Sequence, residues 1–317
     1  MTPCTFLPVF FEHHQCVKHG RPLPAVADYD QVENVWLGFN GLGKLETYRY
    51  MYAECSSIAA LQEWMLALKG AVHLQQAAHD FAQWMQQRGT TATAFTPQAA
   101  VLTTAQRAHW QQHGYLRIPG LVPPAQCNAV MELICEQLGA DLTDPTTWYQ
   151  DHPDWHGLML QVYQHESMAA IRTLLAIRQV FAALYGSDQL VPNTEKVSFN
   201  PPETARWKFP HGQLHWDIDF NQPDLHYIQG LVYLNDVPAH RGPLTLVPGF
   251  HHQFKAFVQQ YPDAHAAHQR MRDTVSSVPV PGQQGDVVLW LQTLPHAASA
   301  NHDSLPRFVQ YISFSRL

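Results

Sequence analysis

Apolar residues follow helical spacing in the first two thirds of this 317-residue chain and short strand-like runs in the last third. The helical part is clearest where apolar residues recur every three to four positions. A capping box of Thr103 and Gln106 marks one helix start, and glycines mark helix ends. Helices are predicted, in order along the chain, at Ile58 to Gln87 with a break at Gly70, Thr103 to Gly114, Pro124 to Gly139, and Met168 to Tyr185 as one long helix.

Strand-like runs separated by Pro, Gly, Asn and Asp turns follow this helical region. They lie at residues 195–199, 213–220, 228–237, 244–247, 276–281, 287–291 and 308–314, after two earlier runs at 115–118 and 158–163. Many short strands in succession predict a closed or double-sheet β unit with flanking helices.

The first hundred residues differ from the rest. Residues 1–54 show no strong period, and we expect them to be ordered only by packing on the remainder of the chain. Residues 89–102 carry Thr-Ala repeats and a proline, which is typical of a linker. The sequence therefore predicts two domains: a partly helical N-terminal extension, 1–100, and a main domain, 101–317.

Composition narrows the class of protein. The hydrophobic content of 46% is ample for a buried core, and a net charge of −7 without a Lys/Arg cluster argues against a nucleic-acid partner. The five cysteines show no metal-binding or disulfide rhythm, so we expect free thiols. No apolar run approaches the roughly 18 residues of a membrane span. We therefore expect a cytoplasmic protein without a membrane partner.

Candidate chemistry begins with His215 and Asp217, which stand two residues apart in a strand-like run. In a strand, residues i and i+2 face the same side, so the imidazole and the carboxylate would converge on one point. Two histidines and one carboxylate, with open coordination positions, favour non-haem ferrous iron. A strand-end histidine hydrogen-bonded to a neighbouring carboxylate is the simpler structural alternative.

A third ligand is sought near the C-terminus. His296 follows the apolar strand 287–291, whereas His302, the alternative, lies in a polar loop where a solvated histidine is expected. Asp219, one step beyond Asp217, is expected beside the ligands or on the surface. Arg307 opens the last strand, so a cation would lie near the metal if strands 287–291 and 308–314 pair as a hairpin.

An ordered set of motifs, rather than any single one, carries a resemblance that spans about residues 102 to 317. The set comprises Gly114 to Gly120, His215 with Asp217, Gly242 to His251, Gly285 with Asp286, His296 and Arg307. It resembles the phytanoyl-CoA dioxygenase family of iron(II)- and 2-oxoglutarate-dependent oxygenases. The spacing of eleven residues between the last two motifs (307 − 296) is the family's spacing.

The resemblance implies a double-stranded β-helix, a jelly-roll or cupin-like barrel, with the N-terminal helical extension outside it. It implies His215, Asp217 and His296 as iron ligands and Arg307 as the partner of the distal carboxylate of 2-oxoglutarate. Two further residues are expected at the co-substrate pocket: Tyr233, sixteen positions after Asp217 (233 − 217), as a lining aromatic, and Gln161 as a polar contact.

The activity implied is hydroxylation of an unactivated C–H bond of a small-molecule metabolite by O2 and 2-oxoglutarate, with release of succinate and CO2 and with ascorbate as a supporting reductant. Asp217 argues against halogenation, because halogenating relatives carry a small residue at this ligand position. Desaturation, a non-catalytic metal-binding cupin-like protein and a zinc hydrolase remain as alternatives. Neither the substrate nor the oligomeric state follows from the sequence.

The chain also departs from the family pattern. Trp216 stands where the mammalian enzyme that names the family carries Gln, and Ala298 where that enzyme carries Ser. Part of the co-substrate's hydrogen bonding is therefore expected from Ser299 or Asn301. No segment resembles a coenzyme A site.

Overall fold

The protein is described from a computed structural model, which covers residues 6–88, 101–209, 212–218, 220, 226–261 and 263–317. The chain forms two compact units. One contains residues 1–99, 178–195 and 313–317, and the other contains residues 100–177 and 196–312. The domain boundary expected near residue 100 lies at the edge of a stretch outside the described residues, so it stays a prediction.

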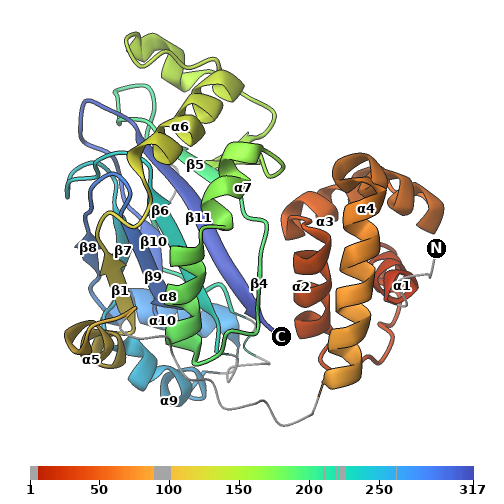
Figure 1. The fold of residues 1–317 in the computed structure, drawn as a ribbon. Coiled ribbons are helices and arrows are strands. Elements are labelled where there is room, and N and C mark those ends of the chain that lie inside the picture. The colour runs from red at the N-terminus through yellow and green to blue at the C-terminus, as the bar shows by residue number, and fades with distance from the viewer. Residues whose placement is uncertain (1–5, 89–100, 210–211, 219, 221–225, 262) are drawn as a thin grey trace. The chain divides into compact units, whose positions relative to one another are not determined.

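Two antiparallel sheets form the framework of the second unit (Figure 1). The larger has the order β1 (Tyr115–Ile118), β9 (Val287–Leu291), β6 (Ile228–Tyr233), β11 (Arg307–Arg316), β5 (Val197–Asn200), β3 (Met159–Leu160) and β2 (Trp155–His156). β4 (Leu190–Pro192) pairs with the end of β11, and both of these segments belong to the first unit. The smaller has the order β10 (His296–Ala298), β7 (Leu244–Leu246) and β8 (Val278–Val280).

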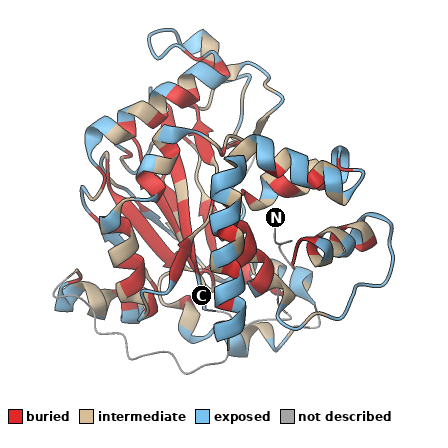
Figure 2. Cartoon of the chain, turned by 45° about the vertical axis from the view of Figure 1, so that its right-hand side comes forward, coloured by how far each residue is buried: buried red, intermediate tan, exposed pale blue. Residues whose placement is uncertain are grey.

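One hydrophobic core lies between these two sheets. Buried side chains of the large sheet pack there against buried side chains of the small sheet: Leu231, Tyr233, Val288 and Val309 from the former, and Leu244, Leu246 and Val280 from the latter. Figure 2 shows the strands as mostly buried, while the helices alternate between buried and exposed positions. Two facing antiparallel sheets with helices outside them confirm the predicted double-stranded β-helix fold.

The helices after residue 100 are α5 (Thr104–His113), α6 (Pro124–Leu138), α7 (Glu166–Arg172), α8 (Leu175–Tyr185), α9 (Phe254–Val258) and α10 (Ala264–Thr274), with 3-10 turns at Pro145–Tyr149 and Phe250–His252. The capping box at Thr103 and the left-handed glycine after α5 are confirmed. The single helix predicted from Met168 to Tyr185 is wrong. The Thr173 hydroxyl donates to the Ala169 carbonyl, and a tighter turn at Leu174 separates α7 from α8.

The turn at Gly285 and Asp286 explains one of the sequence motifs. Gly285 has φ +85°, and a Cβ there would lie 2.2 Å from the carbonyl oxygen of Val122. The buried Asp286 carboxylate accepts from the Arg117 guanidinium at 2.6 Å and from the Gly120 backbone N–H at 2.9 Å. The motif thus locks the strand β9 to the segment that follows β1.

No single helix in the described ranges is long and apolar enough to cross a bilayer. The bent pair α7 and α8, with an angle of 42° between the helices, meets the length and composition of a span only as a pair. Cys16, Cys55, Cys127 and Cys135 are free thiols.

The first unit contains the helices α1 (Leu7–Lys18), α2 (Tyr29–Asn40), α3 (Lys44–Ala53) and α4 (Ile58–Gln87), together with residues 178–185 of α8. The predicted break in α4 is confirmed, because Gly70 has non-helical angles (φ 73°, ψ 160°). The first three helices lie where the sequence showed no period. One reason is that α2 buries Glu33 on its inner side together with Trp36, so that side is not purely apolar.

Glu33 is the centre of a buried polar cluster in this unit, with only 1% of its surface exposed. Its carboxylate accepts from His14 Nε2 at 2.8 Å and from the Tyr48 hydroxyl at 2.6 Å, and it pairs with Lys44 Nζ at 3.0 Å. Burial by itself would raise the pKa of Glu33, but these partners outweigh it and lower the pKa to about 2. One ionised carboxylate therefore ties α1, α2 and α3 together.

Because this pKa is depressed in the folded state, ionised Glu33 contributes stability above its unfolded pKa of 4.5, and the contribution is lost as the pH falls toward 2. The shift corresponds to about 3 kcal/mol. Glu33→Gln should lower the free energy of unfolding at pH 7 by about that amount and flatten its decline between pH 5 and 2, as measured by urea denaturation. Glu12→Gln is the control, because Glu12 is 52% exposed in its pair with Arg21. Equal losses in both variants would contradict the assignment.

Candidate metal centre

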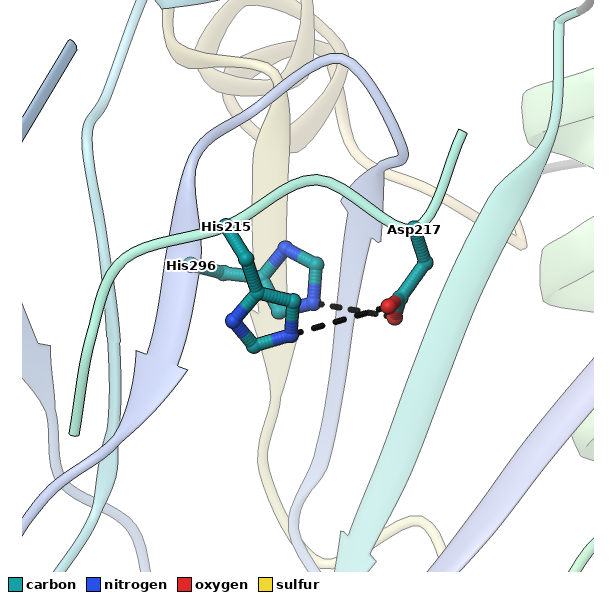
Figure 3. Close-up of side chains that lie close together, drawn as sticks. All are labelled: His215, Asp217 and His296. Atoms are coloured by element: carbon teal, nitrogen blue, oxygen red, sulfur yellow. Dashed lines mark ion pairs between the residues drawn. The ribbon is translucent and has the colours of Figure 1, made fainter. Parts of the chain in front are cut away.

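Three side chains meet at one edge of the small sheet: His215, Asp217 and His296 (Figure 3). Asp217 Oδ1 lies 3.6 Å from His215 Nε2, and Asp217 Oδ2 lies 3.4 Å from His296 Nε2. One potential ligand atom from each residue lies within 4.8 Å of the others, and no other group in the described part of the chain has this arrangement. The structure thus brings together the three residues that the sequence singled out.

Backbone pairing places the two histidines. His215 and His296 form an isolated antiparallel bridge in which each N–H donates to the other's carbonyl oxygen, both at 3.0 Å. Residues directly opposite each other in such a bridge project to the same face. Their ring centroids consequently lie 4.6 Å apart. His296 is also paired with Leu246 in the small sheet, so this ligand lies on a regular strand.

Hydrogen bonds set the tautomer of both imidazoles. His215 Nδ1 lies 3.0 Å from the Gln213 carbonyl oxygen, and His296 Nδ1 lies 3.1 Å from the Leu294 carbonyl oxygen. A carbonyl can only accept, so Nδ1 carries a proton in each ring, and in the neutral ring the lone pair is therefore on Nε2. Burial and the neighbouring His296 lower the pKa of His215, which keeps this ring neutral at pH 7.

Asp217 supplies the anionic donor of the group. Partial burial opposes its ionisation, but the facing His296 and His215 outweigh that effect and hold the pKa of Asp217 well below its usual range. Its side chain is 56% exposed, and Oδ2 accepts a hydrogen bond from Gln229 Nε2 at 2.8 Å. Two neutral nitrogens and one carboxylate, with an open side, are the donor set that suits ferrous iron.

The strand predicted over residues 213–220 is wrong, because among the residues of this stretch that the structure describes, 213–218 and 220, only His215 pairs with a strand. The physical reason lies in Trp216, which is 4% exposed and uses its donors elsewhere. Its indole N–H donates to the Thr293 carbonyl oxygen at 3.1 Å, and its backbone N–H donates to His268 Nε2 at 3.2 Å. These bonds replace a strand ladder, yet the segment still brings its two ligands to one point.

Helix α10 holds this ligand segment through two side chains. His268 accepts from the backbone of Trp216, and its Nδ1 donates to the Ala264 carbonyl oxygen at 2.7 Å. Arg272 Nε donates to the Leu214 carbonyl oxygen at 2.8 Å. The backbone on both sides of His215 is therefore fastened to a helix more than fifty residues later in the chain.

The Arg307 side chain is buried, with 1% exposure. Its Nη1 donates to the Gly242 carbonyl oxygen at 2.8 Å, and its Nη2 donates to the Ser198 hydroxyl at 2.9 Å. Its Nε has no partner, and no described carboxylate pairs with the guanidinium. A buried guanidinium with a free donor suits a bound carboxylate.

The position of Arg307 does not come from the expected hairpin, because β6 lies between β9 and β11 and β11 pairs with β5. A different path connects it to the metal ligands. A Cβ on Gly242 would lie 2.8 Å from the Ser299 carbonyl oxygen, three residues beyond His296. Arg307 donates to the Gly242 carbonyl oxygen, so it is linked through Gly242 to the segment that follows His296.

The two further residues expected at the co-substrate pocket, Tyr233 and Gln161, have hydrogen-bond partners within the protein. The Tyr233 hydroxyl donates to the Val280 carbonyl oxygen at 2.7 Å and accepts from the Leu244 N–H, so the buried phenol offers mainly its ring. The Gln161 amide oxygen accepts from the Tyr163 hydroxyl. Their co-substrate roles stay predictions.

The residues considered as substitute co-substrate contacts or as an alternative metal ligand have other partners. Ser299 donates to the Pro243 carbonyl oxygen at 2.7 Å, and the Asn301 amide donates to backbone carbonyls. His302 is 64% exposed and lies 3.4 Å from Glu203, away from the metal group. Asp219 lies outside the described residues.

Sequence reasoning missed Gln229, Ser198, His268 and Arg272. For Gln229 a signal existed, since it has the same strand parity as Tyr233 and therefore faces the same side of β6. His268 and Arg272 lie on one face of a helix at positions i and i+4, but nothing in the sequence indicates which loop that face contacts.

Comparisons with known proteins agree with this geometry. Residues 110–309 match the family described as phytanoyl-CoA dioxygenase (PhyH). A methylphosphonate hydroxylase of Gimesia maris is 23% identical over 225 residues, which cover 68% of this chain and 82% of the relative.

Among solved structures, the epimerase SnoN in complex with Fe3+, alpha ketoglutarate and nogalamycin RO has a TM-score of 0.51 at 20% identity, covering 69% of this chain and 84% of that chain. AviO1 from Streptomyces viridochromogenes Tue57 has a TM-score of 0.51 at 21% identity, covering 69% and 96%. These structural likenesses show the fold. The family match spans well over half of the chain and includes all three grouped side chains. The chain therefore belongs to the phytanoyl-CoA dioxygenase family of oxygenases, with iron(II) and 2-oxoglutarate as its cofactors.

Proposed function

We propose that this protein hydroxylates an unactivated C–H bond of a small-molecule metabolite. In this reaction the substrate, 2-oxoglutarate and O2 give the hydroxylated product, succinate and CO2, so one oxygen atom enters the product and the other enters succinate. The relative from Gimesia maris, a methylphosphonate hydroxylase, supports this outcome. We propose a cytoplasmic location and residues 1–100 as a helical extension of the oxygenase domain at 101–317.

The observation that carries the proposal is the pairing of a complete donor triad with a buried, incompletely satisfied guanidinium. A protein that only stores metal has no need of a buried cation with a free donor. Asp217 is the carboxylate member of the triad, and the presence of a carboxylate at this position supports hydroxylation over halogenation.

In this proposal His215 and His296 present neutral Nε2 atoms to the metal, and Asp217 presents one anionic oxygen. When bound, iron(II) and 2-oxoglutarate would together activate O2: 2-oxoglutarate would give up two electrons on conversion to succinate and CO2, and O2 would be the oxidant of the C–H bond. The protein's part is to hold the three ligands on one side and leave the other side open.

Arg307 and the Ser198 hydroxyl are proposed to bind the distal carboxylate of 2-oxoglutarate. The guanidinium fork matches a carboxylate bidentately, and the buried surroundings strengthen that contact. We assign Tyr233 to the wall of this pocket through its ring and Gln161 to its polar rim.

The proposed oxygenase activity is tested by supplying purified protein with iron(II), ascorbate, 2-oxoglutarate and 18O2. Slow release of succinate carrying one labelled oxygen is expected even without the prime substrate, because the triad and the guanidinium form a co-substrate site by themselves. Binding of 2-oxoglutarate under argon should be measurable separately by calorimetry. No binding at millimolar concentration would contradict the reading, whereas binding without succinate release would favour a non-catalytic metal protein.

The metal assignment predicts a large effect of Asp217→Ala. Loss of the anionic ligand should weaken iron(II) binding by more than the 10–100-fold that outer-sphere partners typically cost. Because Asp217 is exposed, the fold should survive. Iron retained after anaerobic reconstitution is the measurement, and the exposed carboxylate Asp273, as Asp273→Ala, is the control. Equal retention in the two variants would overturn the assignment.

The co-substrate assignment predicts that Arg307→Ala weakens 2-oxoglutarate binding about 30-fold or more, since removing one partner of a buried charge pair costs about 2–5 kcal/mol. Iron binding should be nearly unchanged. Arg307→Lys should recover only part of the loss, because an ammonium lacks the planar fork. The exposed Arg316, as Arg316→Ala, is the control. Similar small effects in both alanine variants would show that the clamp lies elsewhere.

A further inference from the structure

Each of the three grouped side chains has one hydrogen bond that fixes its direction. For His215 and His296 the partner is a main-chain carbonyl two residues earlier, which no substitution removes. For Asp217 the partner is a side chain, the amide of Gln229 on β6. The orientation of the carboxylate is therefore the one part of this arrangement that depends on the identity of a residue outside the triad.

The orientation of the Gln229 amide follows from its partner. An ionised carboxylate only accepts, so the NH2 end must face Asp217 Oδ2, at 2.8 Å. The other end, Oε1, is buried and has no partner. Placing an acceptor in the protein interior without a partner costs free energy, so a residue serving only to fill space would not be a glutamine.

Asp217 has particular need of such a contact. No described residue between Trp216 and Phe220 pairs with a strand, and the Asp217 side chain is 56% exposed, so neither a ladder nor close packing restricts its torsions. Gln229 lies instead on a central strand, in register with Trp290 of β9. A rigid strand thus fixes the direction of a ligand carried by an irregular segment.

We propose that Gln229 is the positioning residue of the metal centre: its amide holds the Asp217 carboxylate toward the two histidine Nε2 atoms before metal binds. The inference rests on the proposed metal site and adds a residue to it. Pre-organisation of the carboxylate removes an entropic cost from metal binding, so its loss should appear in metal affinity.

The chain contains a matched control. Gln310 is likewise a strand glutamine with a buried, unpaired Oε1 and an amide that donates at 2.9 Å, but its acceptor is the Met168 carbonyl oxygen. Replacing either glutamine by leucine or methionine removes the same amide donor and the same unpaired acceptor. Only the change at Gln229 removes a contact to a grouped side chain.

The experiment titrates metal-free Gln229→Leu, Gln229→Met and Gln310→Leu with Mn(II), without 2-oxoglutarate, by calorimetry. Both changes at Gln229 should weaken Mn(II) binding about 10- to 100-fold, whereas Gln310→Leu should stay within about threefold of the parent. Methionine keeps the length of glutamine, so it guards against a packing defect in the leucine variant. Thermal unfolding of the metal-free proteins checks that all variants are folded.

A second readout is the visible charge-transfer absorption of the anaerobic complex with iron(II) and 2-oxoglutarate. Its position should change in both Gln229 variants and not in Gln310→Leu, because it reports the ligand field rather than stability. Parent-like Mn(II) affinity in folded Gln229→Met would overturn the inference while leaving the proposed function intact. A parent protein that binds no Mn(II) or iron(II) would instead overturn the proposed function itself.

Discussion

The pair of backbone hydrogen bonds between His215 and His296 is the constraint on which the rest of the site depends. These two bonds, both 3.0 Å, join an irregular segment to the first residue of β10. They place two imidazoles on one face without any contact between the rings being required. Once the rings are side by side, the main-chain acceptors of their Nδ1 atoms turn both Nε2 lone pairs in a common direction. The carboxylate of Asp217 then completes the group.

The two-sheet architecture gives this pair its surroundings. The small sheet carries His296, while the large sheet carries Gln229 and Arg307, so the two parts of the proposed site are supported by different strands. The core between the sheets is closely filled, and it includes Trp216, whose 4% exposure shows that the residue between two ligands is part of the interior. The aromatic side chains around the ligand segment therefore anchor it.

Much of the site could be predicted from the sequence because its signals are local. Helix caps such as Thr103 and glycine ends such as Gly114 depend on a few neighbouring residues, and strand β9 was predicted with its observed bounds. The spacing of His215 and Asp217 and the ordered motifs singled out three side chains that the structure brings together.

The rest depends on contacts that have no local pattern. The segment 213–220 looked like a strand because its apolar residues alternate, but His268, fifty-two residues after Trp216, competes successfully for the backbone N–H that a ladder would use. The helices before residue 54 were missed because Glu33 occupies a buried position and is satisfied by side chains from two other helices. The spacing of apolar residues reveals a helix whose buried side is apolar, but it does not reveal one that buries a polar residue.

The residues of the site are held in two different ways, by strand pairing and by single side-chain contacts, and this difference affects their stability. His296 is fixed by pairing with Leu246 and with His215, whereas the chain from Leu214 to Asp217 is fastened by Arg272, His268 and Gln229 at separate points. A segment held by a few side-chain contacts opens at lower free energy than a strand in a sheet. Metal bound by residues from both elements adds its binding free energy to the closed form of that segment. At the proposed site the metal would therefore be both a cofactor and the last tie between the segment 214–217 and the barrel. Loss of any one of these contacts would weaken metal binding, because part of the binding free energy would then be used to order the chain.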